Sequence, residues 1–183
     1  MASQETRSSV LAETAWSERR LYALAKRVGT PETTDDYTLS VTAPAHDEEI
    51  AAIPALSDAD VDAAVEQSRA AAEEWRESDL DERAAVLSAF ADLAAANRRE
   101  LMDLIQLETG KSRTHALEET IDIPQNAEYY ADNGPDVLAT ESRAGGVPFA
   151  TSAEVQYDPV GVVGIISPWN YPLVLSFADA IPA

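Results

Sequence analysis

The sequence predicts an α/β fold, and three features of the 183-residue chain support this prediction. Apolar residues recur at helical spacing through most of residues 57–132. Residues 160–166 form a β-branched run interrupted by two glycines, which is typical of a strand buried on both faces of a parallel sheet. Residues 168–172, PWNYP, follow at the carboxyl end of this strand, where ligands bind in open α/β sheets.

Acidic residues dominate the charge, since 33 Asp and Glu stand against 13 Lys and Arg and give a formal net charge of −20. Because the sequence has no cluster of basic side chains that could neutralise phosphates, we expect no nucleic-acid partner. The composition resembles that of halophilic acidic proteins from salt-rich cytoplasms. Such a large charge is tolerable there, because about 1 M salt shortens the Debye length to about 3 Å and screens the repulsion. An acidic surface on a mesophilic protein is the alternative.

The residue types exclude several kinds of site. The chain contains no cysteine, so disulfides, thiolate metal sites and a cysteine nucleophile are excluded within it. His46 and His115 lie far apart in the sequence and fit surface or helix-packing positions, so we expect no metal site and no Ser-His-Asp triad. Glu108 and Glu118 lie on predicted helices, where charge is usually a solvated face, and receive no role.

Two segments bear on localisation. The amino terminus has no basic region followed by an apolar core, so we expect no secretory signal. Residues 159–178 carry no charge, but three prolines, Asn170 and two serines interrupt them. Because a broken backbone in lipid would leave polar groups unsatisfied, we expect a cytoplasmic protein without membrane contact.

The first third of the chain predicts short elements. Residues 1–16 are polar without clear periodicity and predict a flexible tail. Ser17 is expected to cap a helix that runs to Val28, and residues 37–53 predict a hairpin that turns at residues 44–48. The apolar face of the helix comprises Leu21, Leu24, Ala25 and Val28.

Two long amphipathic helices are predicted next. Ser57 starts the first, with Asp58 and Asp60 complementing its amino end. Its inward residues are expected to be Val61, Ala64, Val65, Ser68, Ala72 and Trp75. The second spans residues 81–108 and stops at Gly110. Its apolar face comprises Val86, Leu87, Phe90, Leu93, Ala94, Leu101, Leu104 and Ile105.

A third helix and a ribbon lead to the buried strand. Residues 112–132 predict a helix that Pro124 should kink or split and that Gly134 and Pro135 should close. Residues 141–157 predict a two-stranded ribbon with both faces partly wet. Because a lone ribbon is marginally stable in water, we expect this one to pack against another subunit.

Four stretches carry a resemblance to a known family. They read SDADVDAAVEQSRAAAEEW at residues 57–75, LIQLETGKSRTHALEE at 104–119, NAEYYA at 126–131 and DPVGVVGIISPWNYPL at 158–173. Together they resemble the amino-terminal portion of the NAD(P)-dependent aldehyde dehydrogenase superfamily, and the last stretch is the most specific. The second stretch, with ISPWNYPLVLSFADAIPA at the end of the chain, is most similar to the succinate-semialdehyde dehydrogenase branch.

The resemblance implies the amino-terminal part of the aldehyde dehydrogenase fold, with the helices and first strand of a Rossmann-like cofactor domain and an oligomerisation β-ribbon. The chain then divides into a flexible tail, the helical part of the cofactor-binding domain, a ribbon arm, and a truncated strand and loop. These parts are residues 1–16, 17–140, 141–157 and 158–183. A homo-oligomer, either a dimer or a tetramer, is also implied.

The same resemblance implies a reaction on a small aldehyde. A cysteine thiolate attacks the aldehyde, a hydride passes to NAD or NADP, and water hydrolyses the resulting thioester. Asn170 matches the amide that donates to the developing oxyanion. Without the resemblance, Asn170 is a turn residue between prolines. The positions that line the cofactor match Ile166, Ser167, Pro168 and Trp169, and those that flank the aldehyde tunnel match Tyr171 and Leu175.

The missing cysteine limits what this chain is expected to do alone. The family nucleophile is a cysteine, and the general-base glutamate and glycine-rich phosphate turn are expected in sequence that follows Ala183. The resemblance therefore predicts an amino-terminal fragment that is inactive by itself. The alternative is a non-catalytic truncated paralogue that acts as a binding or assembly partner.

We expect the stability of the chain to rise with salt, because counterions screen the mutual repulsion of its excess acidic side chains. The melting temperature, followed by circular dichroism, should increase from low salt to molar KCl. A melting temperature that does not depend on the KCl concentration would contradict this expectation.

Overall fold

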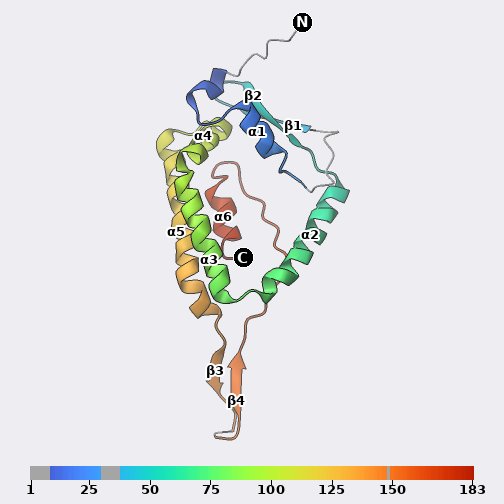
Figure 1. Ribbon diagram of the computed structural model, residues 1–183, viewed down its shortest axis with the longest axis vertical. Coiled ribbons are helices and arrows are strands. Elements are labelled where there is room, and N and C mark those ends of the chain that lie inside the picture. Colours follow the sequence, from blue (N-terminus) through green and yellow to red (C-terminus); the bar gives the residue numbers. More distant parts are fainter. Residues whose placement is uncertain (1–8, 30–37, 148) are drawn as a thin grey trace.

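The structure is a computed structural model that describes residues 9–29, 38–147 and 149–183. Long helices form the body, a small sheet covers one end and a ribbon projects from the other (Figure 1). The predicted tail residues 1–8 and the first predicted hairpin residue, Tyr37, lie outside the described part of the chain.

Four short elements make up the amino-terminal end. They are the 3-10 helix η1 (Ser9–Glu13), α1 (Glu18–Ala25), β1 (Thr38–Ala43) and β2 (Glu48–Pro54). The predicted cap is confirmed, since Ser17 Oγ accepts a hydrogen bond from Arg20 N at 3.4 Å. The strands pair antiparallel, which confirms the hairpin. The helix ends at Ala25 rather than Val28, and both Leu24 and Val28 are exposed.

Part of the predicted tail packs against the body instead of standing free. Leu11 is buried in a cluster with Leu21 and Leu107. Trp16 Nε1 donates to Glu100 O at 2.8 Å, which ties the segment to the middle of the chain. Apolar burial and this hydrogen bond explain why residues 9–16 differ from a frayed terminus.

Helix α2 (Asp58–Glu77) begins at Ser57, as the sequence predicts. Ser57 Oγ accepts from Asp60 N at 3.3 Å, and Asp60 accepts from Ser57 N at 2.8 Å, which completes a capping box. No residue of α2 is buried, and Val61 and Trp75 of the predicted inward face are exposed. Figure 1 shows α2 standing apart from the other long helices, so the described chain leaves this face uncovered.

The single helix predicted for residues 81–108 is wrong, because the structure has α3 (Leu80–Ala96) and α4 (Arg98–Thr109) in its place. Asn97 separates them with φ −97° and ψ 13°. Its Nδ2 donates to Leu93 O at 2.8 Å, and such a bond from side chain to backbone competes with the helical ladder.

The predicted apolar face of this region is only partly covered. Ala94 and Ile105 are buried, but Val86 and Leu93 are exposed and lie outside the core cluster shared with α5. The predicted stop is confirmed, since Gly110 follows α4 in the left-handed conformation with φ 72°.

Helix α5 (Arg113–Leu138) is one unbroken helix, so Pro124 does not split it, and Gly134 and Pro135 do not close it. A proline inside a helix removes one backbone hydrogen bond. Close packing of α5 on α3 offsets that loss, because small side chains let the two helices approach. The shared core cluster contains Ala91 and Ala94 of α3 and Ile123 and Ala127 of α5.

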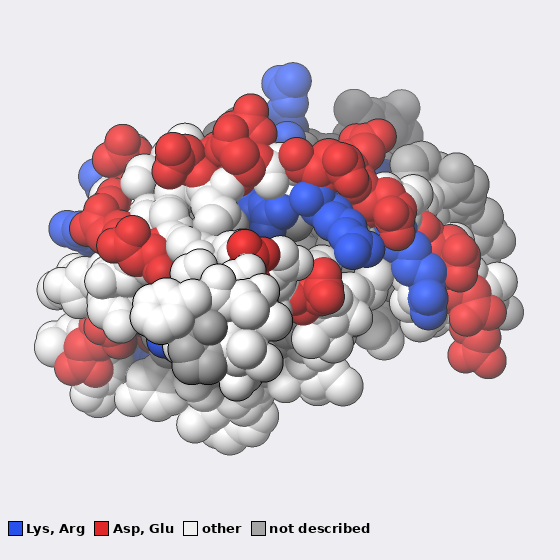
Figure 2. Space-filling view, turned by 90° about the horizontal axis from the view of Figure 1, so that it is seen from below, with Lys and Arg blue, Asp and Glu red and all other residues white. Residues whose placement is uncertain are grey.

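The predicted ribbon is confirmed. Strands β3 (Glu141–Ala144) and β4 (Ser152–Val155) pair antiparallel, and the ribbon projects from the body in Figure 1. Every residue of β4 is exposed. Seen from the ribbon end, acidic side chains gather along one side with Lys and Arg between them, beside a broad uncharged area (Figure 2).

The predicted buried strand at residues 160–166 is wrong, because these residues form no strand and Val160 and Ile166 are each 100% exposed. A strand of a parallel sheet needs neighbours, and no strand among the described residues lies beside this segment. The segment runs through the middle of the molecule in Figure 1 and leads to α6 (Val174–Ala180), which the sequence analysis did not predict.

Helix α6 is anchored by its apolar side. The rings of Phe177 and Phe90 stack with centroids 5.0 Å apart, and Ile181 is buried in the cluster shared by α3 and α5. Among the described residues, no helix is long and apolar enough to cross a membrane.

Gly110 and Gly164 should respond differently to alanine. Gly110 has φ +72°, where a Cβ is strained, whereas nothing lies within 4 Å of a Cβ added at Gly164. We expect Gly110→Ala to lower the free energy of unfolding by about 1 kcal/mol, and Gly164→Ala to leave it unchanged or raise it by less than about 1 kcal/mol. Urea unfolding measures both, and a more stable Gly110→Ala variant would contradict the assigned backbone conformation.

Candidate functional site

The PWNYP loop, residues 168–172, joins the extended segment to α6. Asn170 is exposed in the turn, and its side chain makes no hydrogen bond to any described residue. Trp169 is 82% exposed. The loop therefore presents a free amide and an indole side by side, while its two ends are held by contacts with the body.

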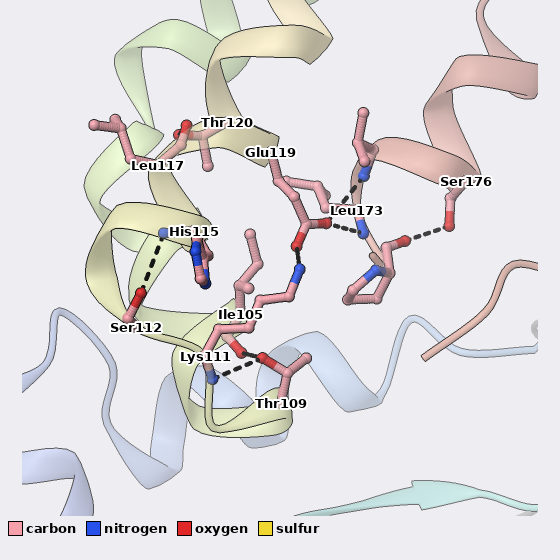
Figure 3. A network of polar contacts seen from close by, with 12 residues as sticks. Ile105, Thr109, Lys111, Ser112, His115, Leu117, Glu119, Thr120, Leu173 and Ser176 are labelled. Atoms are coloured by element: carbon pink, nitrogen blue, oxygen red, sulfur yellow. Dashed lines mark hydrogen bonds and ion pairs between the residues drawn. The ribbon is translucent and has the colours of Figure 1, made fainter. Parts of the chain in front are cut away.

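Glu119 holds the carboxyl end of the loop. Its side chain is 0% exposed, and its Oε2 accepts hydrogen bonds from Leu173 N at 3.0 Å and from Val174 N at 3.2 Å. Figure 3 shows Glu119 reaching from α5 toward Leu173. Leu173 itself packs against two core clusters, so both its backbone and its side chain are fixed.

Lys111 balances the charge of Glu119. Its Nζ donates to Glu119 Oε1, and its side chain is only 14% exposed. The same ammonium lies 3.6 Å from the centroid of the Tyr171 ring, in a cation–π contact. One lysine thus contacts both the buried carboxylate and the residue that follows Asn170.

The corner between α4 and α5 places these two side chains. Gly110 turns the chain, and Lys111 N then donates to Thr109 Oγ1 at 3.2 Å. Ser112 caps α5 by accepting from His115 N at 3.4 Å. Because α5 starts at this corner, Glu119 faces back toward Lys111 (Figure 3).

Ser176 ties the two ends of the loop together. Its Oγ lies 2.5 Å from Pro172 O and 2.7 Å from Ser167 Oγ. A hydroxyl has one proton, so donation by Ser176 to the Pro172 carbonyl leaves Ser167 to donate to Ser176. The residues before and after the turn are therefore linked through α6.

The structure ties two of the predicted site residues to other parts of the molecule. Ser167 Oγ lies 2.7 Å from Ser176 Oγ of α6, and the Tyr171 ring contacts the Lys111 ammonium. The remaining predicted residues lie on an open, exposed surface rather than in an enclosed tunnel; they are Ile166, Pro168, Trp169, Asn170 and Leu175.

Lys111 and Glu119 were not among the predicted site residues, although both lie in the stretch at residues 104–119 that carries the resemblance. A signal was available for Glu119. It falls among Ala116, Thr120 and Ile123, which are all buried along one side of α5. A carboxylate in such a stripe needs a cation or several donors.

Other acidic residues and the histidines do not join the site. Partial desolvation by surrounding groups raises the pKa of the Glu108 carboxyl, although the residue as a whole remains exposed. Glu118 is exposed as well, and neither side chain has a partner among the described residues. His115 is exposed on α5. Within the described ranges, no group of three or more His, Cys, Asp or Glu side chains could hold a metal ion.

A cavity of about 630 Å³ lies away from the predicted site residues, none of which lines it. It opens between the amino-terminal segment and the α4–α5 corner. Among its charged lining residues, Arg113 contacts Asp103 and Lys111 contacts Glu119, while Glu13 and Arg99 contribute one charge of each sign. This cavity has no unbalanced cluster of charge to attract a ligand.

Comparisons with known proteins match these features to a family. A model described as the aldehyde dehydrogenase family matches residues 31–183. The chain is 46% identical over 135 residues to the "Putative succinate-semialdehyde dehydrogenase (NADP+)" of Mycolicibacterium smegmatis, a match that covers 74% of this chain and 26% of that protein.

Solved structures agree. An NAD-dependent benzaldehyde dehydrogenase from Corynebacterium glutamicum matches with a TM-score of 0.74 and 31% identity, covering 82% of this chain and 32% of that one. An NADP-dependent glyceraldehyde-3-phosphate dehydrogenase from Bacillus halodurans, complexed with NADP, matches with a TM-score of 0.71 and 30% identity, covering 77% and 30%. These matches confirm the predicted fold class, and the chain spans about a quarter to a third of the length of these proteins.

We expect Glu119→Leu to destabilise the chain by about 3 kcal/mol or more, because it leaves the Lys111 ammonium without its buried partner. The double variant Lys111→Met/Glu119→Leu should be more stable than Glu119→Leu alone, since no charge then remains unpaired. Urea unfolding compares the two. Equal stabilities would contradict the expectation that an unpaired Lys111 ammonium destabilises Glu119→Leu.

Proposed function

Because the chain belongs to the aldehyde dehydrogenase family, we propose that it is the amino-terminal part of an enzyme that oxidises a small aldehyde to a carboxylate with NAD(P)+. It covers 26% of its mycobacterial relative and contains no cysteine. The thiolate that the family resemblance implies is therefore not among these residues. We propose that the longer protein is the active species and that the 183-residue chain is inactive alone.

The state of Asn170 is the observation that carries this proposal. Its amide has no partner among the described residues, whereas both ends of its loop are tied to α5 and α6. A donor that is free to bond, on a loop that is held at both ends, stabilises charge that develops on a reacting oxygen with little movement of the backbone. Asn170 would donate to the oxyanion that forms when a thiolate attacks the aldehyde carbon.

The residues before Asn170 fit a role in holding the cofactor. Ile166 and Trp169 expose apolar side chains near Ser167 in the sequence, and a combination of apolar surface and a hydroxyl suits a planar ring with an attached ribose. We assign Ile166, Ser167, Pro168 and Trp169 to NAD or NADP, which accepts a hydride when bound. The relatives' names mention both cofactors.

The substrate and the assembly are inferred from exposed side chains and from the names of relatives. Tyr171 and Leu175 are exposed, and we assign them to the aldehyde path. The name of the mycobacterial relative favours succinate semialdehyde as the substrate. The exposed ribbon, which is marginal as a lone hairpin, favours a homo-oligomer that is held through β3 and β4.

In the longer enzyme, Asn170→Ala should lower kcat about a hundredfold while leaving cofactor affinity nearly unchanged, because the lost donor acts on the transition state. Steady-state NAD(P)H production and a cofactor titration measure the two effects. Asn133→Ala is the matched control, since Asn133 lies exposed on α5 and should leave kcat unaltered.

The 183-residue chain alone should produce no NAD(P)H from succinate semialdehyde. If this chain alone produced NAD(P)H, the proposal that further sequence is required would be wrong.

For the Asn170→Ala variant of the longer enzyme, an unaltered kcat would rule out the oxyanion role of Asn170.

A further inference from the structure

We propose that Glu119 is a positioning residue that sets the place of Asn170 by capping α6 from another helix. The capping contact stands on the geometry alone, and its effect on catalysis rests on the proposed function of Asn170.

Helix α6 begins without a cap of its own. Its first residues carry backbone N–H groups that have no partner within the helix. The residue at the cap position, Leu173, has no side-chain oxygen to offer, and no side-chain cap bond is present there. Glu119 supplies the acceptor instead, at 3.0 Å from Leu173 N and 3.2 Å from Val174 N. A carboxylate also complements the positive end of the helix dipole.

Both oxygens of the Glu119 carboxylate accept hydrogen bonds. One oxygen accepts from two backbone donors, and the other accepts from Lys111 Nζ. A buried carboxylate that lost one of these partners would incur a desolvation cost, so the group has little freedom to move. Because Glu119 lies on the continuous helix α5, its hydrogen bonds fix the position of Leu173, three residues after Asn170.

Lys111 links the Glu119 carboxylate to the residue that follows Asn170. Its ammonium touches the Glu119 carboxylate and lies 3.6 Å from the ring centroid of Tyr171, the next residue in the loop. At the other end, Ser167 is tied to Ser176 at 2.7 Å. None of these contacts uses the Asn170 amide, so the loop is held while the amide stays free.

Amide hydrogen exchange in the 183-residue chain tests the cap. Glu119→Gln keeps the shape of the side chain but turns an NH2 group toward either Lys111 or the backbone donors. We expect the amides of Leu173 and Val174 to exchange about tenfold faster, as for the loss of a charge-assisted bond. Glu118→Gln, at the exposed neighbouring position, should leave both rates unchanged.

A second substitution covers the case in which Glu119→Gln does not fold. Glu119→Asp keeps a negative charge near Lys111 but shortens the side chain by one methylene, which withdraws it from Leu173 and Val174. Faster exchange at these two amides, with the helical circular dichroism retained, supports the cap. Exchange rates equal to those of the unmodified chain overturn it.

A double-mutant cycle in the longer enzyme tests the link to Asn170. Glu119→Gln should lower kcat about tenfold with cofactor KM nearly unchanged, and the same change in an Asn170→Ala background should alter kcat by less than about twofold. Equal losses in both backgrounds overturn the positioning role. If Asn170→Ala alone leaves kcat unchanged, the oxyanion proposal fails and the positioning role in catalysis fails with it, while the exchange rates still decide the cap.

Discussion

The buried pair of Glu119 and Lys111 is the interaction on which the carboxyl-terminal third of the structure depends. A carboxylate without solvent contact must find donors, and here it finds an ammonium and two backbone N–H groups. These donors come from the α4–α5 corner and from the start of α6. The need to satisfy one charge therefore brings three separate parts of the chain together around the PWNYP loop.

The same corner explains how a very acidic chain uses its few basic residues. With 13 Lys and Arg against 33 Asp and Glu, most acidic side chains face solvent and need no partner. The buried acids differ, because Asp103 contacts Arg113 and Glu119 contacts Lys111. Scarce cations are thus placed where desolvation makes an unpaired carboxylate most costly.

Two apolar surfaces remain open among the described residues. One is the predicted inward face of α2, and the other is the segment at residues 160–166. The helices α3, α4, α5 and α6 have partners and form core clusters, so they hold the loop without these surfaces. The geometry around Asn170 is therefore set by the helices, whereas the sheet that the β-branched run predicts requires strands that the described chain does not supply.

Local sequence determined the features that depend on a few neighbouring residues. Ser17 and Ser57 fix helix starts, Gly110 fixes a helix end, and the alternating residues near 141–157 fix a ribbon, because caps, left-handed turns and pairing act within a short stretch. Sequence also identified the PWNYP loop and the family resemblance. Tertiary structure decided the rest. Packing of α5 on α3 kept the helix whole across Pro124, and residues 160–166 stayed unpaired because no strand of the described chain lies beside them. Burial joined Glu119 to Leu173 across 54 positions of sequence, a distance over which no local pattern acts.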